Sequence, residues 1–186
     1  EEIGELDNTV VIYSSDNGYF LGEHTFNDKR LAYENSMRIP MLIRFPSLIK
    51  NKSTISEQCL NIDVAPTILD LAGIDIPSYM QGESMLTLLK GEKVNDWRKS
   101  ILFEYYLDSY WPYAGPNLIA VRTEKFKLID NFLKNDIDEL YDLKKDPGEM
   151  TNLINDKKYD EIELEMRNQA EFLKKKYKYN PDRDWW

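Results

Sequence analysis

The sequence has very little cysteine and histidine, and it has no long apolar segment. Its single cysteine, Cys59, excludes an intrachain disulfide and a cysteine-based zinc site. Its single histidine, His24, excludes chemistry that needs two imidazole groups from this segment. The longest apolar runs, such as Thr9–Tyr13 and Ile39–Ile43, are far shorter than the ~20 residues of a membrane-spanning helix, so no membrane span is expected.

Basic residues are outnumbered by acidic ones. The chain has 24 Lys and Arg residues against 33 Asp and Glu residues, and a net charge of −9, so nucleic acid is not an expected partner. With 42% hydrophobic residues, the 186-residue chain can bury a core, which excludes a disordered protein. The chain begins at Glu1 with neither Met nor a signal peptide, and we interpret it as a segment of a longer protein.

The first half of the chain has the pattern of an α/β domain. Thr9–Ser15 is an unbroken β-branched and aromatic run, typical of a parallel-sheet strand buried on both faces. Pro40–Phe45 predicts a second strand. Helices are expected over residues 63–72, which Gly73 follows, and over Ser84–Lys90. We therefore expect residues 1–95 to form the C-terminal part of an α/β domain with a doubly wound sheet, part of which is absent.

The second half has the pattern of a small antiparallel sheet. Short strands are expected over residues 101–106, 118–123, 126–129 and 139–143, with turn-rich stretches between them. Apolar residues then recur at steps of three and four, which predicts an amphipathic helix: Tyr159, Ile162, Met166, Ala170, Leu173 and Tyr177. We expect residues 96–186 to be a C-terminal subdomain, a four-stranded antiparallel sheet packed by this helix.

A polar pair, Asp16-Asn17, directly follows the first predicted strand. Ligands of open α/β sheets gather beyond the carboxyl ends of the strands. A carboxylate and an amide oxygen suit a hard cation such as Ca²⁺ or Mg²⁺. The tripeptide Asp16-Asn17-Gly18 is equally typical of a turn in which both side chains bond their own backbone. The spacing alone leaves both interpretations open.

The loop after this pair contains His24 and Lys29. A lone loop histidine or lysine often has no catalytic role. A cation, an imidazole and metal ligands within one loop would nevertheless form an electropositive pocket for a tetrahedral oxyanion. These residues by themselves therefore support only anion or ester chemistry in general.

The order of these residues resembles a known family. Five motifs, spread over nearly the whole chain, are similar to motifs of the sulfatases, which belong to the alkaline-phosphatase-like superfamily. The first runs from Ser15-Asp16-Asn17-Gly18 through Leu21-Gly22-Glu23-His24, Lys29 and Tyr33-Glu34 to Arg38-Ile39-Pro40. The others are residues 61–73, 80–84, 120–128 and 139–153, with the cores Asp63-Val64-Ala65-Pro66-Thr67, Gln81-Gly82-Glu83-Ser84, Val121-Arg122-Thr123 and Glu139-Leu140-Tyr141-Asp142-Leu143.

The resemblance implies roles for four residues. Asp16 and Asn17 match two of the family's ligands for a divalent metal, usually Ca²⁺. Lys29 matches the lysine that binds a sulfate oxygen, and His24 matches a histidine on the leaving-group side of the pocket. Both are thus implied to be catalytic and to bind substrate.

The chain also departs from the family pattern. Sulfatases use a formylglycine nucleophile that is made from Cys or Ser in a motif absent here. Cys59 has neither the Pro nor the Arg of that motif, so we interpret it as a small buried residue. The upstream Asp pair that completes the metal site is missing too. The resemblance is thus to the C-terminal part of a sulfatase, and we expect this fragment alone to be inactive.

Three functions remain open at this point. The first is the C-terminal portion of a sulfatase that hydrolyses sulfate esters of a small molecule or glycan, with the N-terminal remainder of the enzyme as its partner. Aromatic residues at 105–106 and 110–113 could stack on a sugar or could be packing residues. The second is a phosphodiesterase or phosphonate hydrolase of the same superfamily, and the third is a non-catalytic binding module. The family resemblance also suggests a periplasmic, secreted or lysosome-like compartment.

Overall fold

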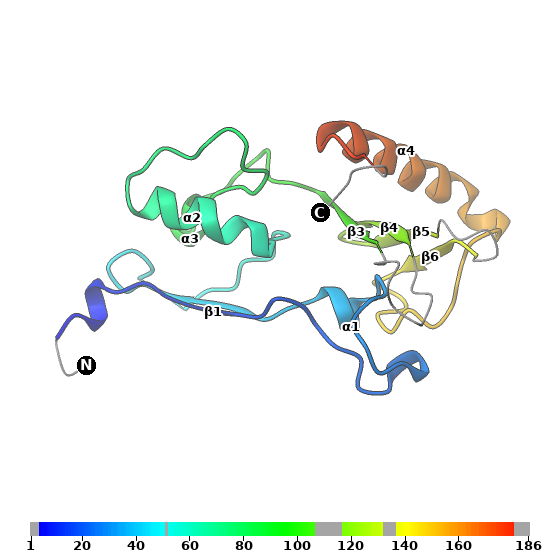
Figure 1. Ribbon diagram of the computed structural model, residues 1–186, viewed down its shortest axis with the longest axis horizontal. Coiled ribbons are helices and arrows are strands. Elements are labelled where there is room, and N and C mark those ends of the chain that lie inside the picture. Colours follow the sequence, from blue (N-terminus) through cyan, green and yellow to red (C-terminus); the bar gives the residue numbers. More distant parts are fainter. Residues whose placement is uncertain (1–3, 51, 107–116, 132–136, 181–186) are drawn as a thin grey trace. The chain divides into compact units, whose positions relative to one another are not determined.

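The computed structural model describes residues 4–50, 52–106, 117–131 and 137–180 of the chain (Figure 1). These residues form two compact units. Unit 1 comprises residues 1–16 and 39–98, and unit 2 comprises residues 17–38 and 99–186. The chain therefore leaves unit 1 after Asp16, returns to it at Ile39 and leaves it again after Arg98. The division into residues 1–95 and 96–186 stays a prediction.

Unit 1 consists of a two-stranded ladder and two helices. Strands β1 (Val11–Ser14) and β2 (Met41–Arg44) pair antiparallel, with Tyr13 opposite Leu42. Helix α2 (Val64–Leu71) confirms the first predicted helix, and the left-handed Gly73 (φ +69°) lies beyond its end. Helix α3 (Leu86–Leu89) confirms the second and is shorter than expected. The core of the unit contains Met85, Leu88, Leu89 and Trp97, with Met41 and Ile43 of β2 packed against it.

The ladder corrects one expectation about the first strand. Its run of β-branched residues indicated a parallel strand buried on both faces, whereas β1 is antiparallel to β2 and mostly exposed. Side chains alternate between the faces of a strand. Met41 and Ile43 face the core of unit 1, while Tyr13 and Leu42 are 61% and 65% exposed. Burial of the second face requires another layer, which the described part of unit 1 does not provide.

The buried carboxylate of Asp63 joins the two helical motifs of unit 1. Its Oδ2 accepts a hydrogen bond from Leu60 N (2.7 Å), and its Oδ1 accepts one from Glu83 N (2.8 Å). Thr67 Oγ1 donates to Asp63 O and accepts from Met85 N. A Cβ at Gly82 would lie 2.1 Å from the Ile62 carbonyl oxygen, so only glycine fits this approach.

Arg98 neutralises Asp63 inside the protein. Its guanidinium binds both carboxylate oxygens, with 2.7 Å between Nη2 and Oδ1. The arginine side chain is 3% exposed, and the aspartate side chain is fully buried. Arg98 Nη1 and Trp97 Nε1 also donate to the carbonyl oxygen of Gln58. A two-pronged charged hydrogen bond of this kind fixes geometry as well as charge.

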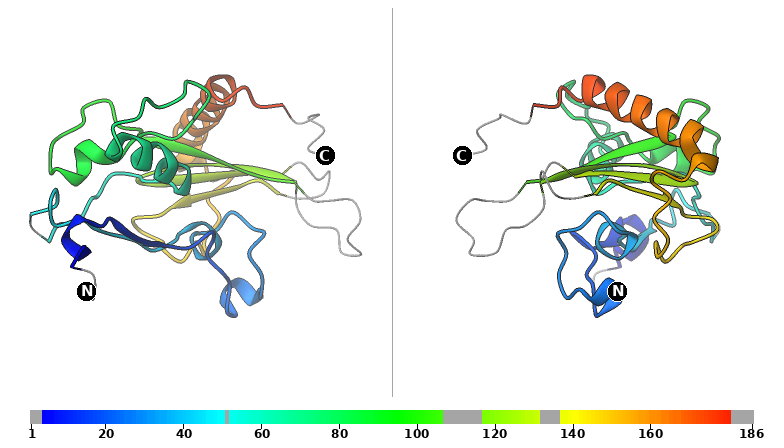
Figure 2. Two further views of the ribbon diagram at one scale, coloured as in Figure 1. Left: turned by 60° about the vertical axis from the view of Figure 1, so that its left-hand side comes forward. Right: turned by 90° about the vertical axis from the view of Figure 1, so that its right-hand side faces the viewer.

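Unit 2 contains the predicted four-stranded sheet. Strands β3 (Ser100–Tyr105), β4 (Leu118–Thr123), β5 (Phe126–Asn131) and β6 (Glu139–Asp142) pair antiparallel in chain order. Helix α4 (Asp160–Lys176) covers one face of this sheet (Figures 1 and 2). All six residues of the predicted apolar stripe pack there, with Met166, Ala170 and Leu173 fully buried. The sequence prediction of a helix-packed antiparallel sheet is confirmed.

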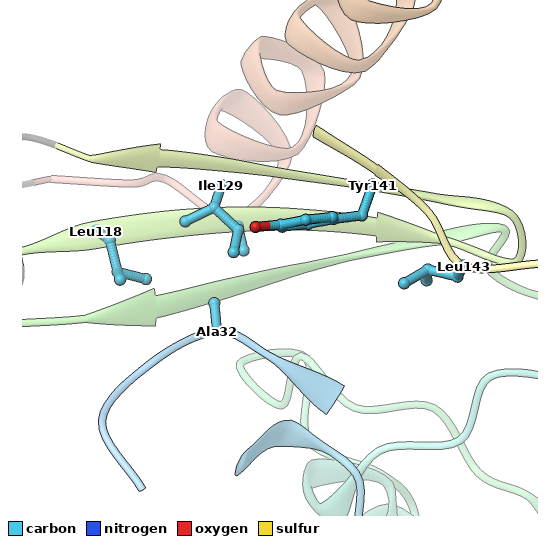
Figure 3. Packing of buried hydrophobic residues seen from close by; sticks show 6 residues of the cluster. Ala32, Leu118, Ile129, Tyr141 and Leu143 are labelled. Atoms are coloured by element: carbon cyan, nitrogen blue, oxygen red, sulfur yellow. The ribbon is translucent and has the colours of Figure 1, made fainter. Parts of the chain in front are cut away.

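The other face of the sheet supports the loop of residues 17–38. Alternate strand residues point to the two faces, so Val121, Leu128 and Leu140 contact α4 while Leu118, Ile129 and Tyr141 point the other way. Figure 3 shows Ala32 of the loop against this second set. The loop contains a single 3₁₀ turn (Glu23–Thr25) and the short helix α1 (Glu34–Met37). The loop is therefore a third layer of unit 2.

None of the helices in the described residues is long and apolar enough to cross a lipid bilayer. The aromatic residues Tyr110, Trp111 and Tyr113, considered above for sugar stacking, lie outside the described part of the chain.

Replacing Asp63 with asparagine tests the buried pair of unit 1. Asp63→Asn would leave the buried guanidinium of Arg98 with only the partly exposed Glu83 carboxylate, 3.8 Å from Nη2, as a countercharge among the described residues. Removing one partner of a buried ion pair typically costs about 3–5 kcal/mol. We expect urea denaturation to show a loss of this size in the free energy of unfolding. Asp75→Asn, the same change at an exposed position, is the control and should have little effect. Equal stability of the two variants would contradict the structural role of Asp63.

Candidate functional site

The side chains of Lys29 and Asn17, both in the loop of residues 17–38, contact each other. The Lys29 ammonium donates a hydrogen bond to Asn17 Oδ1 at 3.2 Å, and Asn17 Nδ2 donates to the Gly18 carbonyl at 2.7 Å. The Lys29 side chain is otherwise at the surface, and Asn17 is half-buried. The amide oxygen of Asn17 thus already faces a cation, and the Lys29 ammonium retains donors for an anion.

The backbone around this pair is fixed by the remainder of the loop. Gly18 N donates to Ser36 O (2.8 Å), and the buried Ser36 hydroxyl donates to Lys29 O. Lys29 N donates to Asp28 Oδ1 at 2.7 Å. A Cβ at Gly18 would lie 2.1 Å from Asn35 O, so glycine is required for this close approach.

His24 is held by aromatic rings. Its imidazole stacks on the Tyr33 ring, with 4.2 Å between ring centroids and 27° between planes. Phe20, which is fully buried, meets the imidazole edge-on at 6.1 Å. His24 has φ 51° and Thr25 has φ 64°, left-handed values that are unfavourable for residues other than glycine. Such strain persists where surrounding contacts determine the conformation.

The Tyr33 side chain reaches β6 across a long stretch of sequence. Its hydroxyl donates to Glu139 Oε2 at 2.7 Å, and the Tyr141 hydroxyl donates to the same oxygen at 2.6 Å. Burial and the neighbouring Glu139 carboxylate raise the pKa of both tyrosines, so both remain hydrogen-bond donors.

Glu34, the residue after Tyr33, is bound by two cations of the sheet. Arg122 binds both of its carboxylate oxygens at 3.0 Å, and the Lys127 ammonium lies 2.8 Å from Oε1. Lys127 is fully buried and also pairs with Glu149 Oε1 at 2.7 Å. Glu149 Oε2 in turn accepts a hydrogen bond from the backbone N–H of Glu34 at 2.6 Å. These four side chains, called the Lys127 cluster below, bind α1 to the sheet.

The two carboxylates of the Lys127 cluster respond to burial in different ways. Burial alone would raise the pKa of Glu34, but the hydrogen bonds from Arg122 and the charge of Lys127 outweigh it and lower the pKa to about 2. For Glu149, burial is the dominant influence and raises the pKa, although Lys127 acts in the opposite direction. Glu34 is therefore the firmly ionised partner of the two cations.

One feature of the sequence could have predicted the Lys127 cluster, namely two basic residues on neighbouring strands. Arg122 and Lys127 lie directly opposite each other on β4 and β5. Two like charges in such a pair are destabilising, so carboxylates are required nearby. Glu34 and Glu149 meet this requirement from segments far away in the chain. Sequence reasoning also did not identify the Tyr33–Glu139–Tyr141 network, although all three residues lie in the quoted motifs.

Asp16 and Asn17 provide two oxygen ligands of the kind that Ca²⁺ and Mg²⁺ prefer. Asp16 is exposed, and its Oδ1 accepts a hydrogen bond from Ser15 Oγ at 3.3 Å. No group of three or more His, Cys, Asp or Glu residues in the described part of the chain could hold a metal ion. Because Ca²⁺ takes about 6–8 oxygen ligands, this pair fits part of a metal shell, and other ligands must complete it.

Known proteins resemble this chain along most of its length. A family model described as "N-sulphoglucosamine sulphohydrolase, C-terminal" matches residues 22–176. An N-acetylglucosamine-6-O-sulfatase of Bacteroides thetaiotaomicron is 44% identical over 187 residues, which cover 98% of this chain and 33% of that protein. The chain thus spans about a third of the length of this curated relative.

Solved structures share the fold. A protein in complex with its substrate, D-glucosamine-2-N,6-O-disulfate, superimposes with a TM-score of 0.91 at 40% identity, covering 98% of this chain and 38% of that one. A phosphonate monoester hydrolase of Agrobacterium radiobacter has a TM-score of 0.84 at 24% identity, covering 95% and 37%. At that identity the second likeness concerns the fold alone.

The lowered pKa of Glu34 predicts how unit 2 responds to acid. A carboxyl group whose pKa is lowered by folding stabilises the folded state at pH values above its pKa in the unfolded chain. For Glu34 this contribution is lost as the pH falls from the ordinary pKa of 4.5 through about 2. In urea denaturation, we expect Glu34→Gln to lower the free energy of unfolding by up to about 3 kcal/mol near neutral pH. The difference from the unmodified protein should vanish in strong acid.

Glu165→Gln, which removes an exposed carboxylate from α4, is the control and should leave the acid response unchanged. A Glu34→Gln penalty that is the same at every pH would contradict the assigned ion pairs.

Proposed function

The chain belongs to the sulfatase family, and we propose that it is the C-terminal portion of an enzyme that hydrolyses a sulfate ester of a glucosamine-type sugar. The observation that supports this most directly is the pairing of Lys29 with Asn17 in a loop that the sheet of unit 2 fixes in place. The relative named as an N-acetylglucosamine-6-O-sulfatase and the structure bound to a disulfated glucosamine support the choice of sugar. The remainder of the enzyme would supply the nucleophile, a formylglycine.

Lys29 would bind the sulfate. A sulfate ester under attack gains negative charge on its oxygens, and a fixed ammonium with three donors stabilises that charge. The Lys29 ammonium keeps donors beyond the one used by Asn17. The contacts of Ser36 and Asp28 with the Lys29 backbone keep that backbone at one place in the loop.

His24 would act on the leaving-group side. When the bond between sulfur and the sugar oxygen breaks, its electron pair remains on that oxygen, which needs a proton. A histidine imidazole is the side chain that most often serves as a general acid, and it can donate this proton. The partial exposure of His24 leaves its imidazole accessible to a substrate.

Asp16 and Asn17 would hold a divalent cation, Ca²⁺ or Mg²⁺, together with ligands from the rest of the enzyme. Such a cation polarises the sulfate oxygens as a Lewis acid. Asp16 would contribute a charged oxygen and Asn17 a neutral one. A periplasmic, secreted or lysosome-like compartment remains part of the same proposal.

The phosphonate hydrolase alternative has weaker support. Its structural likeness to the chain shows the shared fold only, whereas the sulfatase relative is 44% identical over nearly the whole length of this chain. Parallel assays of a sulfate ester and a phosphonate ester with the intact enzyme separate the two activities. A non-catalytic binding module would hydrolyse neither.

The isolated chain should not turn over sulfate esters. The described residues hold only part of a metal shell, and the chain has no formylglycine motif. Incubation of the purified chain with an aryl sulfate and Ca²⁺ should give no hydrolysis above the buffer. Sustained hydrolysis by a preparation free of intact sulfatase would contradict this expectation.

In the intact enzyme, Asp16→Ala and Lys29→Ala should fail in different ways. Loss of Asp16 weakens the cation site, so added Ca²⁺ should restore part of the activity by mass action. Loss of Lys29 removes a charged group that contacts the sulfate and should lower kcat/KM by about 10²–10³. Added Ca²⁺ should not restore that loss.

A Ca²⁺ titration of both variants measures the difference. Lys90→Ala, which removes an exposed lysine from unit 1, is the control and should keep full activity. Near-normal turnover by Lys29→Ala would show that the assigned sulfate contact is wrong.

A further inference from the structure

His24 depends on groups that are distant from it in the chain. Its own backbone is strained at φ 51°, between Gly22 at φ 121° and Thr25 at φ 64°. A left-handed backbone at a residue other than glycine costs free energy and persists only where the surroundings determine it. Its imidazole contacts the rings of Phe20 and Tyr33.

Tyr33 is fixed at three points. Phe20 meets its ring edge-on at 5.9 Å, and Glu139 accepts a hydrogen bond from its hydroxyl at 2.7 Å. Its backbone immediately precedes α1, and Glu34, the first residue of that helix, is bound by Arg122 and Lys127. The ring on which His24 stacks is therefore rigidly connected to the sheet.

Glu139 and Tyr141 of β6 form the part of this network that belongs to the sheet. They lie two residues apart on β6 and so point to the same face of the sheet, the face that supports the 17–38 loop. One carboxylate oxygen of Glu139 accepts hydrogen bonds from both tyrosine hydroxyls, at 2.7 and 2.6 Å. Charge-assisted hydrogen bonds of this length are strong and directional.

We propose that Tyr33 and Glu139 are positioning residues for His24, because Glu139 orients the Tyr33 ring and the ring sets the plane of the imidazole. This inference rests on the proposed role of His24. In the reaction, the sugar oxygen retains the electron pair of the broken S–O bond and takes a proton from the His24 imidazolium. The remainder of the enzyme would supply both the hydroxyl nucleophile that takes the sulfuryl group and the base that takes the proton of that hydroxyl. Positioning by Tyr33 and Glu139 affects the proton transfer from His24 to the sugar oxygen.

The choice of substrate distinguishes positioning from ordinary stability. A sugar alkoxide is a poor leaving group and needs the proton, whereas the phenolate of para-nitrophenyl sulfate leaves without one. Defects that act through His24 should therefore affect a sulfated glucosamine and spare para-nitrophenyl sulfate. A general loss of structure would lower the turnover of both substrates together.

The experiment uses the intact enzyme and measures kcat and KM for these two substrates. His24→Ala should lower kcat for the sulfated glucosamine by about 10²–10⁴, the usual range for a general acid. Tyr33→Leu removes the stacked ring and should lower the same kcat by about 10–10² with little change in KM, since misplaced groups lose rate more than affinity. Tyr33→Phe keeps the ring and should lose less. Tyr19→Leu, the same change at a half-exposed position of the loop, is the control.

A double variant completes the test. If Tyr33 acts through His24, Tyr33→Leu should cost almost nothing further in the His24→Ala enzyme. Should Tyr33→Leu fail to fold, Tyr33→Phe and Glu139→Gln replace it. The first removes the hydroxyl donor, the second replaces the charged acceptor with a weaker neutral one, and both keep the ring.

The outcomes separate this inference from the proposed function. Loss of activity on both substrates, or a full additional loss in the double variant, overturns the positioning role. Full activity of Tyr33→Leu on the sulfated glucosamine overturns it too. Normal turnover of that substrate by His24→Ala overturns the proposed role of His24 itself.

Discussion

The fully buried ammonium of Lys127 is the constraint on which unit 2 depends. A charge in this position is unfavourable without compensation, and Glu34 and Glu149 supply it from two other segments. Glu149 also accepts a hydrogen bond from the backbone N–H of Glu34, so one carboxylate helps fix both the charge and the start of α1. The loop of residues 17–38 therefore has one place on the sheet where the buried charges are all paired.

Unit 1 also contains a buried ion pair, which holds its two short helices together. Arg98 and Asp63 form a buried pair whose carboxylate also holds the backbone at Leu60 and Glu83. Several motifs that carry the family resemblance are thus explained by packing and charge pairing. Asp63, Thr67 and Gly82 hold two short helices together, whereas Lys29 is exposed and His24 partly exposed on a loop. Family motifs in one chain can therefore mark the scaffold in one place and the candidate site in another.

Local sequence patterns predicted the elements whose formation depends on neighbouring residues, such as single helices and strands. The apolar stripe from Tyr159 to Tyr177 fixed the buried face of α4, since helical spacing by itself places these residues on one side. The run at Thr9–Ser15 predicted a strand correctly but could not specify its partner, which depends on β2. The pairing of Lys127 with Glu34 and of Tyr33 with Glu139 joins residues about a hundred positions apart, and no periodicity records such contacts. The candidate residues Asp16, Asn17, His24 and Lys29 were found through family resemblance, because their types alone also fit an ordinary turn and surface.

The path of the chain between the two units has an evolutionary consequence. Residues 17–38 are flanked on both sides by segments of unit 1. Their own supports, Arg122, Lys127, Glu139 and Glu149, nevertheless all lie in the second half of the chain. The C-terminal subdomain is therefore not an independent module that recombination could exchange among relatives. A transplanted sheet would meet a loop with mismatched carboxylates and rings, so loop and sheet are expected to diverge together as one inherited block.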